Sequence, residues 1–261
     1  MDTQQIDTNV PNAGRVYDYV LGGSHNFEAD RNAAEYMISL IPSTRKWVRM
    51  LRQFLQEATL QLAEEGHDKF LDLGSGLPTS EHIHSLVPDA RVVYVDVDPV
   101  TILYGTELLG NTDNARYVQA DVRDVESVLN ATTIQEMFGD SRKVVIVLNA
   151  MLCFFTEDEA KHMVQALYDW AAPGSKLFAT FECKNPDMTT PNIEAFVGMF
   201  NQMGAYYEFS TPEKSLEIMK PWRVDERGLR PLSQWLDVAD QFNEADREGV
   251  DLEFYGAIFE K

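Results

Sequence analysis

The chain has 261 residues, of which 44% are hydrophobic and 25% charged, so it is long enough to bury a substantial core in one domain. Its 42 acidic and 22 basic residues leave a formal net charge of −20, which repels phosphate backbones and anionic membrane surfaces. We therefore expect neither nucleic acid nor a membrane as a partner. Only two cysteines occur and long apolar runs are absent, which favours a cytoplasmic location.

Residues 1–66 are predicted to form a helical arm, or lid, that packs on the α/β core formed by residues 67–261. Apolar side chains recur in this arm at helical spacing and so give one continuous apolar face. These side chains are Trp47, Val48, Leu51, Phe54, Leu55 and Ala58. The sequence leaves open whether the domain forms a homo-oligomer.

From Lys69 onward, short β-branched runs alternate with stretches of helical period, which is typical of an α/β fold with a parallel sheet covered on both faces. The predicted strands are 69–73, 91–96, 115–119, 144–149, 176–182, 204–209 and 252–259. The predicted helices are 79–87, 99–109, 124–138, 157–171 and 191–203. Thr156 and Glu159 form a capping box that predicts the start of the fourth of these helices.

The first predicted strand runs into a glycine turn within the segment FLDLGSGLPT, residues 70–79. Gly74 and Gly76 would let the backbone approach a ligand closely, and the following helix would offer free amide groups. Asp72, near the end of the strand, would orient the turn or bind an amino group. Such turns also serve packing alone, so the motif indicates a nucleotide-type ligand without naming it.

The second predicted strand ends at Asp96, 20 residues after Gly76, where a carboxylate can accept hydrogen bonds from ribose hydroxyls. The same spacing suits a nicotinamide dinucleotide. However, a dinucleotide fingerprint expects a third glycine where Thr79 stands, which disfavours that cofactor. Asp98 is expected to cap the helix that begins at Pro99.

The third and fourth predicted strands also end in polar side chains. Asp121 would accept a hydrogen bond from an adenine amino group or, alternatively, cap the helix near Val125. Asn149 ends the fourth strand, where ligands of α/β sheets bind. The apolar segment that follows it would suit a sulfonium methyl donor.

Two further features, a pair of adjacent glycines and the histidines, lie outside these strand ends. The adjacent glycines Gly22 and Gly23 predict a loop that closely approaches another group, which is either a ligand or a packed element. None of the five histidines pairs with cysteine or carboxylate at a ligand spacing, so we expect no metal site. His82 and His84 would lie on different sides of a helix.

Three segments together resemble the actinobacterial S-adenosyl methyltransferase family, which was once known as a domain of unknown function. They are RVYDYVLGGSHNFEAD (15–30), FLDLGSGLPT (70–79) and VYVDVDP (93–99). The similarity continues near the C-terminus at PWR (221–223) and YGA (255–257). It implies a Rossmann-like class I methyltransferase fold, in which a seven-stranded, mostly parallel sheet has an antiparallel last strand and the cofactor lies across its first four strands.

The resemblance implies S-adenosyl-L-methionine as the cofactor and S-adenosyl-L-homocysteine as the product. Asp72, Gly74 and Gly76 would hold the methionine part, Asp96 the ribose, Asp121 the adenine amine and Asn149 the backbone near the sulfur. An arm that closes over the donor would comprise Tyr17, Gly22, Gly23, Asn26 and Phe27. The expected cofactor contacts also include Thr79, Val97 and Val122. The segment 153–155, CFF, lacks the histidine that relatives carry there, so no catalytic base is inherited.

Methyl transfer from a sulfonium is an in-line displacement that needs mainly proximity, alignment and exclusion of water. If the acceptor must lose a proton, the candidate bases are Glu182, His25 and Tyr206. Glu182 comes first, because it ends an apolar strand where burial would raise its pKa. Methionine and aromatic residues between 185 and 235 would line a pocket for a small, apolar acceptor. The alternatives are a regulatory protein that binds the cofactor and a nicotinamide-dependent oxidoreductase.

Overall fold

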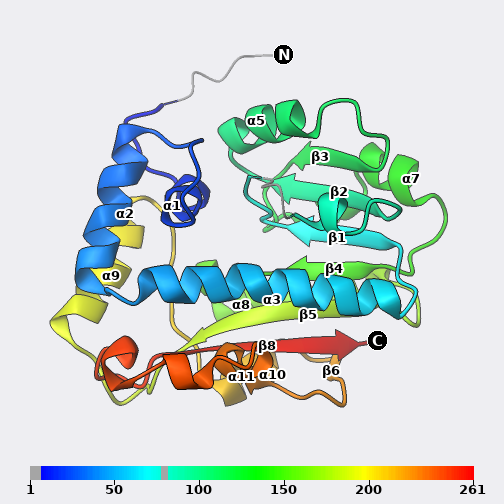
Figure 1. Cartoon of the computed structure of the whole chain (residues 1–261). Helices are drawn as coiled ribbons and strands as arrows, with labels where there is room; N and C mark the ends of the chain where they lie inside the picture. The colour runs from blue at the N-terminus through cyan, green and yellow to red at the C-terminus, as the bar shows by residue number, and fades with distance from the viewer. Residues whose placement is uncertain (1–6, 78–81) are drawn as a thin grey trace.

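The computed structural model describes residues 7–77 and 82–261, and within these residues an eight-stranded mixed sheet forms the centre of the molecule (Figure 1). The strand order is β3-β2-β1-β4-β5-β8-β6, and β7 pairs with β8. Strands β1 to β5 are parallel, and β8 runs antiparallel to β5. The strands are β1 Lys69–Leu73, β2 Arg91–Asp96, β3 Ala115–Gln119, β4 Val145–Leu148, β5 Lys176–Cys183, β6 Arg223–Val224, β7 Arg230–Pro231 and β8 Glu253–Glu260.

The predicted α/β class and the antiparallel last strand are confirmed, although the described sheet has eight strands where seven were expected. The predicted strand 204–209 is wrong. That segment has no regular structure, and only Ser210 forms a bridge, to Cys183. Burial alternates as in a strand, with Tyr207 and Phe209 buried and Tyr206 and Glu208 exposed, but the segment pairs with the sheet only through Ser210. The two buried rings instead join an aromatic cluster with Phe196 and Phe200.

Eleven α-helices occur in the described part of the chain. They are α1 Ala13–Val20, α2 Glu28–Leu40, α3 Thr44–Glu64, α4 Ile83–Leu86, α5 Pro99–Leu109, α6 Val125–Leu129, α7 Thr132–Phe138, α8 Glu157–Trp170, α9 Pro191–Gln202, α10 Pro212–Ile218 and α11 Leu232–Trp235. Short 3-10 turns lie at Leu152–Phe154, Ala239–Gln241 and Glu244–Arg247. The Thr156 capping box at the start of α8 is confirmed.

Two predicted helices are shorter than expected. Residues 124–138 form α6 and α7 and not one helix, because the Asn130 side chain bonds back to the Glu126 carbonyl and Ala131 is extended. The predicted helix 79–87 is present only as α4, and residues 78–81 lie outside the described part of the chain.

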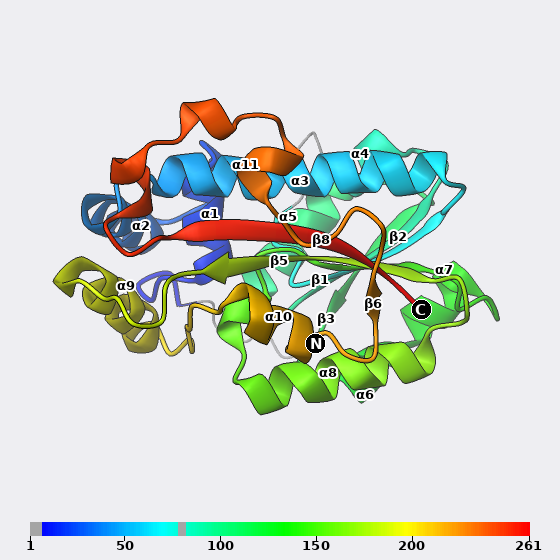
Figure 2. The same ribbon diagram turned by 90° about the horizontal axis from the view of Figure 1, so that it is seen from below.

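Helices cover both faces of the sheet (Figure 2). Side chains that alternate along the strands accordingly divide the core into two layers. Phe70, Val92 and Phe178 pack with apolar residues of α3, α4 and α11. Leu71 and Val93, which point the other way, pack with residues of α6, α7, α8 and α10. Both layers therefore hold the parallel strands in register, which fixes where their carboxyl ends lie.

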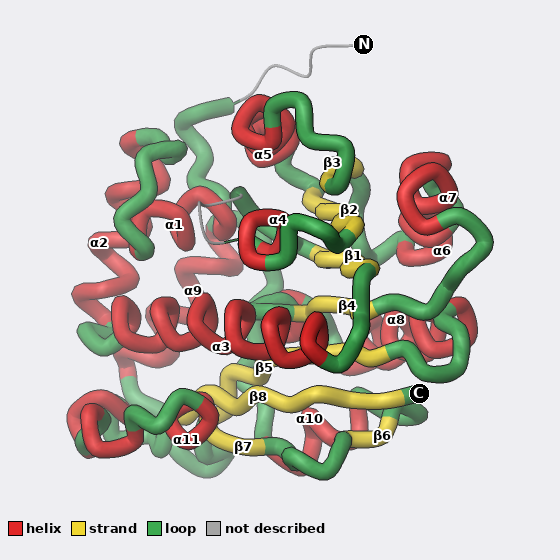
Figure 3. The backbone as a smooth tube through the Cα atoms, turned by 45° about the vertical axis from the view of Figure 1, so that its right-hand side comes forward, coloured by secondary structure: helices red, strands yellow, loops and turns green. Residues whose placement is uncertain are grey.

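The N-terminal helices α1 to α3 lie against the carboxyl end of this sheet. Helix α3 crosses one face (Figure 3), and the six residues of its predicted apolar face are all buried. Helix α2 packs on α1 and α9 at the edge of the molecule. No helix among the described residues is both long enough and apolar enough to cross a membrane.

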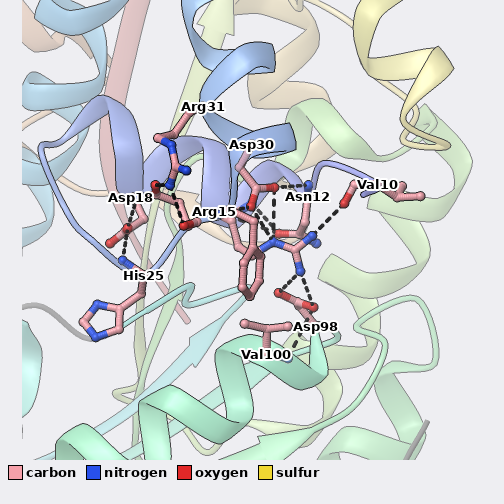
Figure 4. A network of polar contacts seen from close by, with 12 residues as sticks. Val10, Asn12, Arg15, Asp18, His25, Asp30, Arg31, Asp98 and Val100 are labelled. Carbon is pink, nitrogen blue, oxygen red and sulfur yellow. Dashed lines mark hydrogen bonds and ion pairs between the residues drawn. The ribbon is translucent and has the colours of Figure 1, made fainter. Parts of the chain in front are cut away.

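A buried ionic network ties α1 to the sheet (Figure 4). The Arg15 guanidinium lies 3.0 Å from Asp30 of α2 and 3.4 Å from Asp98, which directly precedes α5. Asp98 also accepts from the Val100 amide, so its predicted role as a helix cap is confirmed. Asn12, in turn, caps α1 and donates from its backbone to Asp30.

Candidate functional site

A cavity of about 400 Å³ opens where β1, β2, β4 and β5 end. Residues of α1, α3 and α9 line it together with the strand ends, so the N-terminal helices form its roof. Its volume lies within the range of small-molecule and cofactor sites. Two chemically different ends can be distinguished by the side chains that line them: a polar end at β1 to β3, and an aromatic end near α9.

The glycine turn after β1 lies at the polar end. Gly74 has a φ of +67°, and a Cβ atom placed on it would lie 1.9 Å from the Met151 sulfur. A side chain at this position would therefore have to displace Met151 and adopt a strained backbone. Gly76 has a φ of +63°, and its amide donates to Asp96 at 2.9 Å.

Asp96 is buried at the end of β2 and helps to shape the turn. One carboxylate oxygen accepts from Gly76 and the other from the Asp98 amide at 2.9 Å. Burial raises the pKa of Asp96 to about 6, against the effect of these backbone hydrogen bonds. Val97, the next residue, is exposed and also lines the cavity.

Asp72 lies beside this turn and is almost completely buried. Its Oδ2 atom has no hydrogen-bond partner among the described residues, and the closest cation-forming group is His82, whose Nε2 lies 3.9 Å away. Burial raises the pKa of Asp72 to about 7, while the Arg52 guanidinium lowers it and Asp96 raises it further. The prediction that His82 and His84 face different sides of a helix is wrong, because His82 precedes α4 and both rings contact Tyr94.

Asp121 and Val122, after β3, also line the cavity. Asp121 accepts from the Arg123 amide at 2.9 Å and from its side chain at 3.0 Å. It does not cap α6, because Asp124 takes that role. The alternative structural reading of Asp121 as the cap of α6 is therefore wrong.

The end of β4 is strained. Ala150 has a φ of 55°, which is unusual for a residue with a side chain, and its amide donates to the Thr180 hydroxyl at 2.7 Å. This turn brings both Asn149 and Met151 to the cavity wall. The strain thus places Met151 over Gly74, and it arises at a position where no sequence signal marked a turn.

Glu182 ends β5 and is the charged group of the aromatic end. Its side chain is buried, lines the cavity, and leaves Oε2 without a hydrogen-bond partner among the described residues. Burial raises the pKa of Glu182 to about 7, partly opposed by a hydrogen bond with Cys153. A carboxyl group with this pKa can exchange a proton near neutral pH.

Aromatic rings line the cavity together with Glu182. Tyr207 stacks on Phe200 with ring centroids 4.5 Å apart, and Phe154 meets both rings edge-on at 5.6 Å. Phe196 and Phe209 extend the same cluster. All five rings line the cavity, so this end combines an apolar wall with one buried carboxylate.

The structure brings most of the sequence-predicted cofactor residues together. The cavity is lined by Tyr17, Asp72, Gly74, Gly76, Asp96, Val97, Asp121, Val122 and Asn149. Thr79 lies outside the described residues. The individual roles of these residues stay predictions.

The rest of the expected arm lies elsewhere. Gly23 packs on Asp18, whose Oδ1 would lie 2.0 Å from a Cβ atom at that position, so the close approach that glycine permits is to α1 and not to the cavity. The Asn26 side chain donates to the same carboxylate at 2.9 Å. Phe27 directly precedes α2, and the Arg15 guanidinium lies 5.4 Å from the centroid of the Phe27 ring. These residues and Gly22 are not among the cavity-lining residues.

Two of the three candidate bases are also placed away from the cavity wall. The centroids of the His25 and Tyr104 rings lie 5.1 Å apart. The backbone amide of His25 donates to the Asp18 carboxylate (Figure 4). Tyr206 is exposed and bonded to Glu208, and this hydrogen bond raises the pKa of Tyr206 to about 12. Of the three candidate bases, Glu182 alone lines the cavity.

Sequence reasoning missed Arg52, which reaches the cavity from α3. A signal was available, because Arg52 lies four residues after Val48 and three before Leu55, on the edge of the apolar face. It also missed the first turn of α1 as part of the wall, where Asn12, Ala13 and Gly14 lie. Their position in the cavity wall depends on tertiary packing, which a local sequence pattern does not predict.

The polar end fits S-adenosylmethionine by several independent features. Gly74 and Gly76 let the backbone approach a ligand, Asp96 can accept from ribose hydroxyls, and Asp121, a further hydrogen-bond acceptor, lines the same cavity. The unpaired oxygen of Asp72 matches an ammonium group. The residues present are therefore suited to this cofactor in charge and in shape.

The comparisons with known proteins agree with this fit. A family model described as S-adenosyl methyltransferase matches residues 1–261. A crystal structure of a candidate methyltransferase from Thermobifida fusca is 34% identical with a TM-score of 0.86, covering 98% of this chain and 96% of that one. No curated protein is a significant match.

Two other solved structures are also similar. A DUF574 family protein from Streptomyces avermitilis is 27% identical with a TM-score of 0.84, covering 98% of this chain and 100% of that one. The N-methyltransferase NodS from Bradyrhizobium japonicum shares the fold at 14% identity and a TM-score of 0.50, covering 81% and 96% of the two chains. The chain therefore belongs to the S-adenosyl methyltransferase family and is a methyltransferase that uses S-adenosylmethionine.

Proposed function

We propose that the enzyme methylates a small, predominantly apolar acceptor, and that Glu182 takes the proton from the acceptor's nucleophilic atom. The observation that carries this proposal is the aromatic end of the cavity. Five aromatic side chains line it, and a buried carboxylate with an unpaired oxygen lies among them. Such a wall favours a flat or apolar molecule that presents one O–H, N–H or acidic C–H group.

S-adenosylmethionine supplies an electrophilic methyl group on a sulfonium sulfur. The protein's own groups then have three tasks: to hold the donor at the strand ends, to align the acceptor, and to exclude water. The buried rings around Glu182 exclude water from the place where the proton would move. Because burial raises the pKa of Glu182 to about 7, its carboxylate is a better proton acceptor than an exposed glutamate.

A small molecule is favoured over a macromolecular acceptor. The net charge of −20 opposes binding of nucleic acid, and the aromatic rings are buried and not displayed on the surface. Cys153 and Cys183 are free and buried, which supports our further proposal that the enzyme works in a reducing compartment such as the cytoplasm.

A transfer assay tests the acceptor class. The purified enzyme would be incubated with methyl-labelled S-adenosylmethionine and a panel of phenols, aromatic amines and carbon acids, with RNA and a denatured protein as further acceptors. Label transfer to apolar members of the small-molecule panel, lost in Glu182→Gln, is the expected result. Transfer only to RNA or protein by a folded enzyme would refute the proposal.

A further inference from the structure

The Arg52 guanidinium is an unsatisfied cation at the polar end of the cavity. Its Nε and Nη1 atoms are buried without hydrogen-bond partners, as judged over residues 7–77 and 82–261. The guanidinium lies over the face of the Tyr17 ring, 5.8 Å from the ring centroid. A guanidinium desolvated in this way is costly unless something anionic completes its hydrogen bonds.

Asp72 shows the complementary feature in the same cavity. It is buried, lines the same cavity as Arg52, and keeps Oδ2 unpaired. The two groups interact electrostatically, because the Arg52 charge lowers the pKa of Asp72. No ion pair joins them in the described structure. A cation and an anion that face one cavity without pairing are arranged for a ligand that carries both charges.

We propose that Arg52 binds the carboxylate of the cofactor's amino-acid end, beside the ammonium contact that the family resemblance implies for Asp72. Arginine is suited to this role because its planar fork donates two parallel hydrogen bonds to a carboxylate. Arg52 belongs to α3, so the N-terminal helices supply a cofactor-binding group as well as a roof. The proposal concerns the donor alone and does not depend on the identity of the acceptor.

Tyr17 explains how Arg52 is held in place. Its ring lies beside the guanidinium, and its hydroxyl donates to the Val48 carbonyl at 3.4 Å, one turn before Arg52 on α3. Cation–π contact restrains the guanidinium without using its N–H groups. Those donors therefore stay available to a ligand.

Binding measurements with two matched ligands test the proposal. S-adenosylhomocysteine carries the whole amino-acid end, whereas its decarboxylated analogue keeps the ammonium and lacks the carboxylate. We expect Arg52→Gln to weaken S-adenosylhomocysteine binding about 10- to 100-fold in calorimetric titration, and to change binding of the decarboxylated analogue by less than about 3-fold. Arg49→Gln, an exposed arginine on the same helix, is the matched control and should leave both affinities unchanged.

Asp72→Asn gives the reciprocal result. It should weaken both ligands by similar factors, because both carry the ammonium. Thermal unfolding of each variant checks that it is folded, and Arg52→Lys, which keeps the charge, should recover part of the lost affinity. Equal weakening of both ligands by Arg52→Gln, or no weakening of either, would overturn the assignment of the carboxylate to Arg52.

Discussion

The two ends of the cavity are built in different ways. The polar end consists of groups that follow β1, β2 and β3 in turn, and their positions are set by the topology of a parallel sheet. The aromatic end collects rings from the segment after β4, from α9 and from the irregular stretch that follows α9. The first end follows from strand order, whereas the second follows from how loops and a helix pack. We therefore expect donor binding to be common to the fold and acceptor choice to be specific to this chain.

The largest effect is expected for Glu182→Gln, which alters the aromatic end of the cavity and leaves the polar end unchanged. Turnover should fall about 100-fold or more, because a positioned base is lost, while S-adenosylhomocysteine affinity stays within about 2-fold. In the wild type, kcat at saturating cofactor should rise with pH through about 7, since only ionised Glu182 accepts a proton. Initial rates with an acceptor found in the panel would show this rise.

The variant should show no such dependence, because glutamine does not ionise. Parallel pH profiles in the wild type and in Glu182→Gln would assign the proton transfer to another group.

A change at the polar end should have the opposite signature. Asp96→Ala removes the acceptor for the Gly76 and Asp98 amides as well as the expected ribose contact. We expect the dissociation constant of S-adenosylhomocysteine to rise about 100-fold in calorimetric titration. Asp89→Ala, an exposed aspartate before β2, is the control. Unchanged affinity in a folded Asp96→Ala protein would place the ribose elsewhere.

Glu182 should also change how the free energy of unfolding depends on pH. Its pKa rises from 4.5 to about 7 on folding, so the wild type loses stability as pH increases through that interval. Glu182→Gln escapes this loss and should be more stable by up to about 3 kcal/mol at pH 8, with a smaller difference at pH 5. Urea unfolding at the two pH values measures the difference. A variant less stable than the wild type at pH 8 would contradict the burial of an unpaired charge.

The smallest effects are expected for the two candidate bases that do not line the cavity. His25→Ala and Tyr206→Phe should each change kcat and cofactor affinity by less than about 2-fold, because neither side chain lines the cavity. Steady-state kinetics on both variants check this. A loss of kcat near that of Glu182→Gln in either variant would show that the cavity rearranges during turnover.

Much of the polar end could be predicted because strand ends of a parallel sheet converge whatever the loops do. Asp72 and Asp96 lie at the ends of recognisable apolar strands and Asp121 comes shortly after a third, and the structure brings all three to one cavity. Gly23 shows the limit of the same reasoning. Adjacent glycines correctly predicted a close approach, but the group approached is Asp18 of the chain itself. Adjacent glycines predict that another group lies close to the backbone, but they do not predict which group that is.

The aromatic end was predicted only in part. The density of rings after residue 185 indicated an apolar pocket, yet the same apolar pattern at 204–209 was misread as a strand. A ring stack such as that of Phe200 on Tyr207 depends on the angle between α9 and the loop after it, which no periodicity encodes. Arg52 was overlooked for a related reason, since a lone charge beside an apolar face usually lies in solvent.

The position of β8 has a consequence for how the molecule is made. Residues 253–260 pair with β5, β6 and β7, so three strands have no partner for one edge until this late segment has been synthesised. During translation the long β5 edge, including Glu182, would be open to solvent and to other chains. Cooperative assembly of this half of the sheet must therefore wait for its final strand, and a chain halted before residue 253 would present an unpaired edge prone to aggregation.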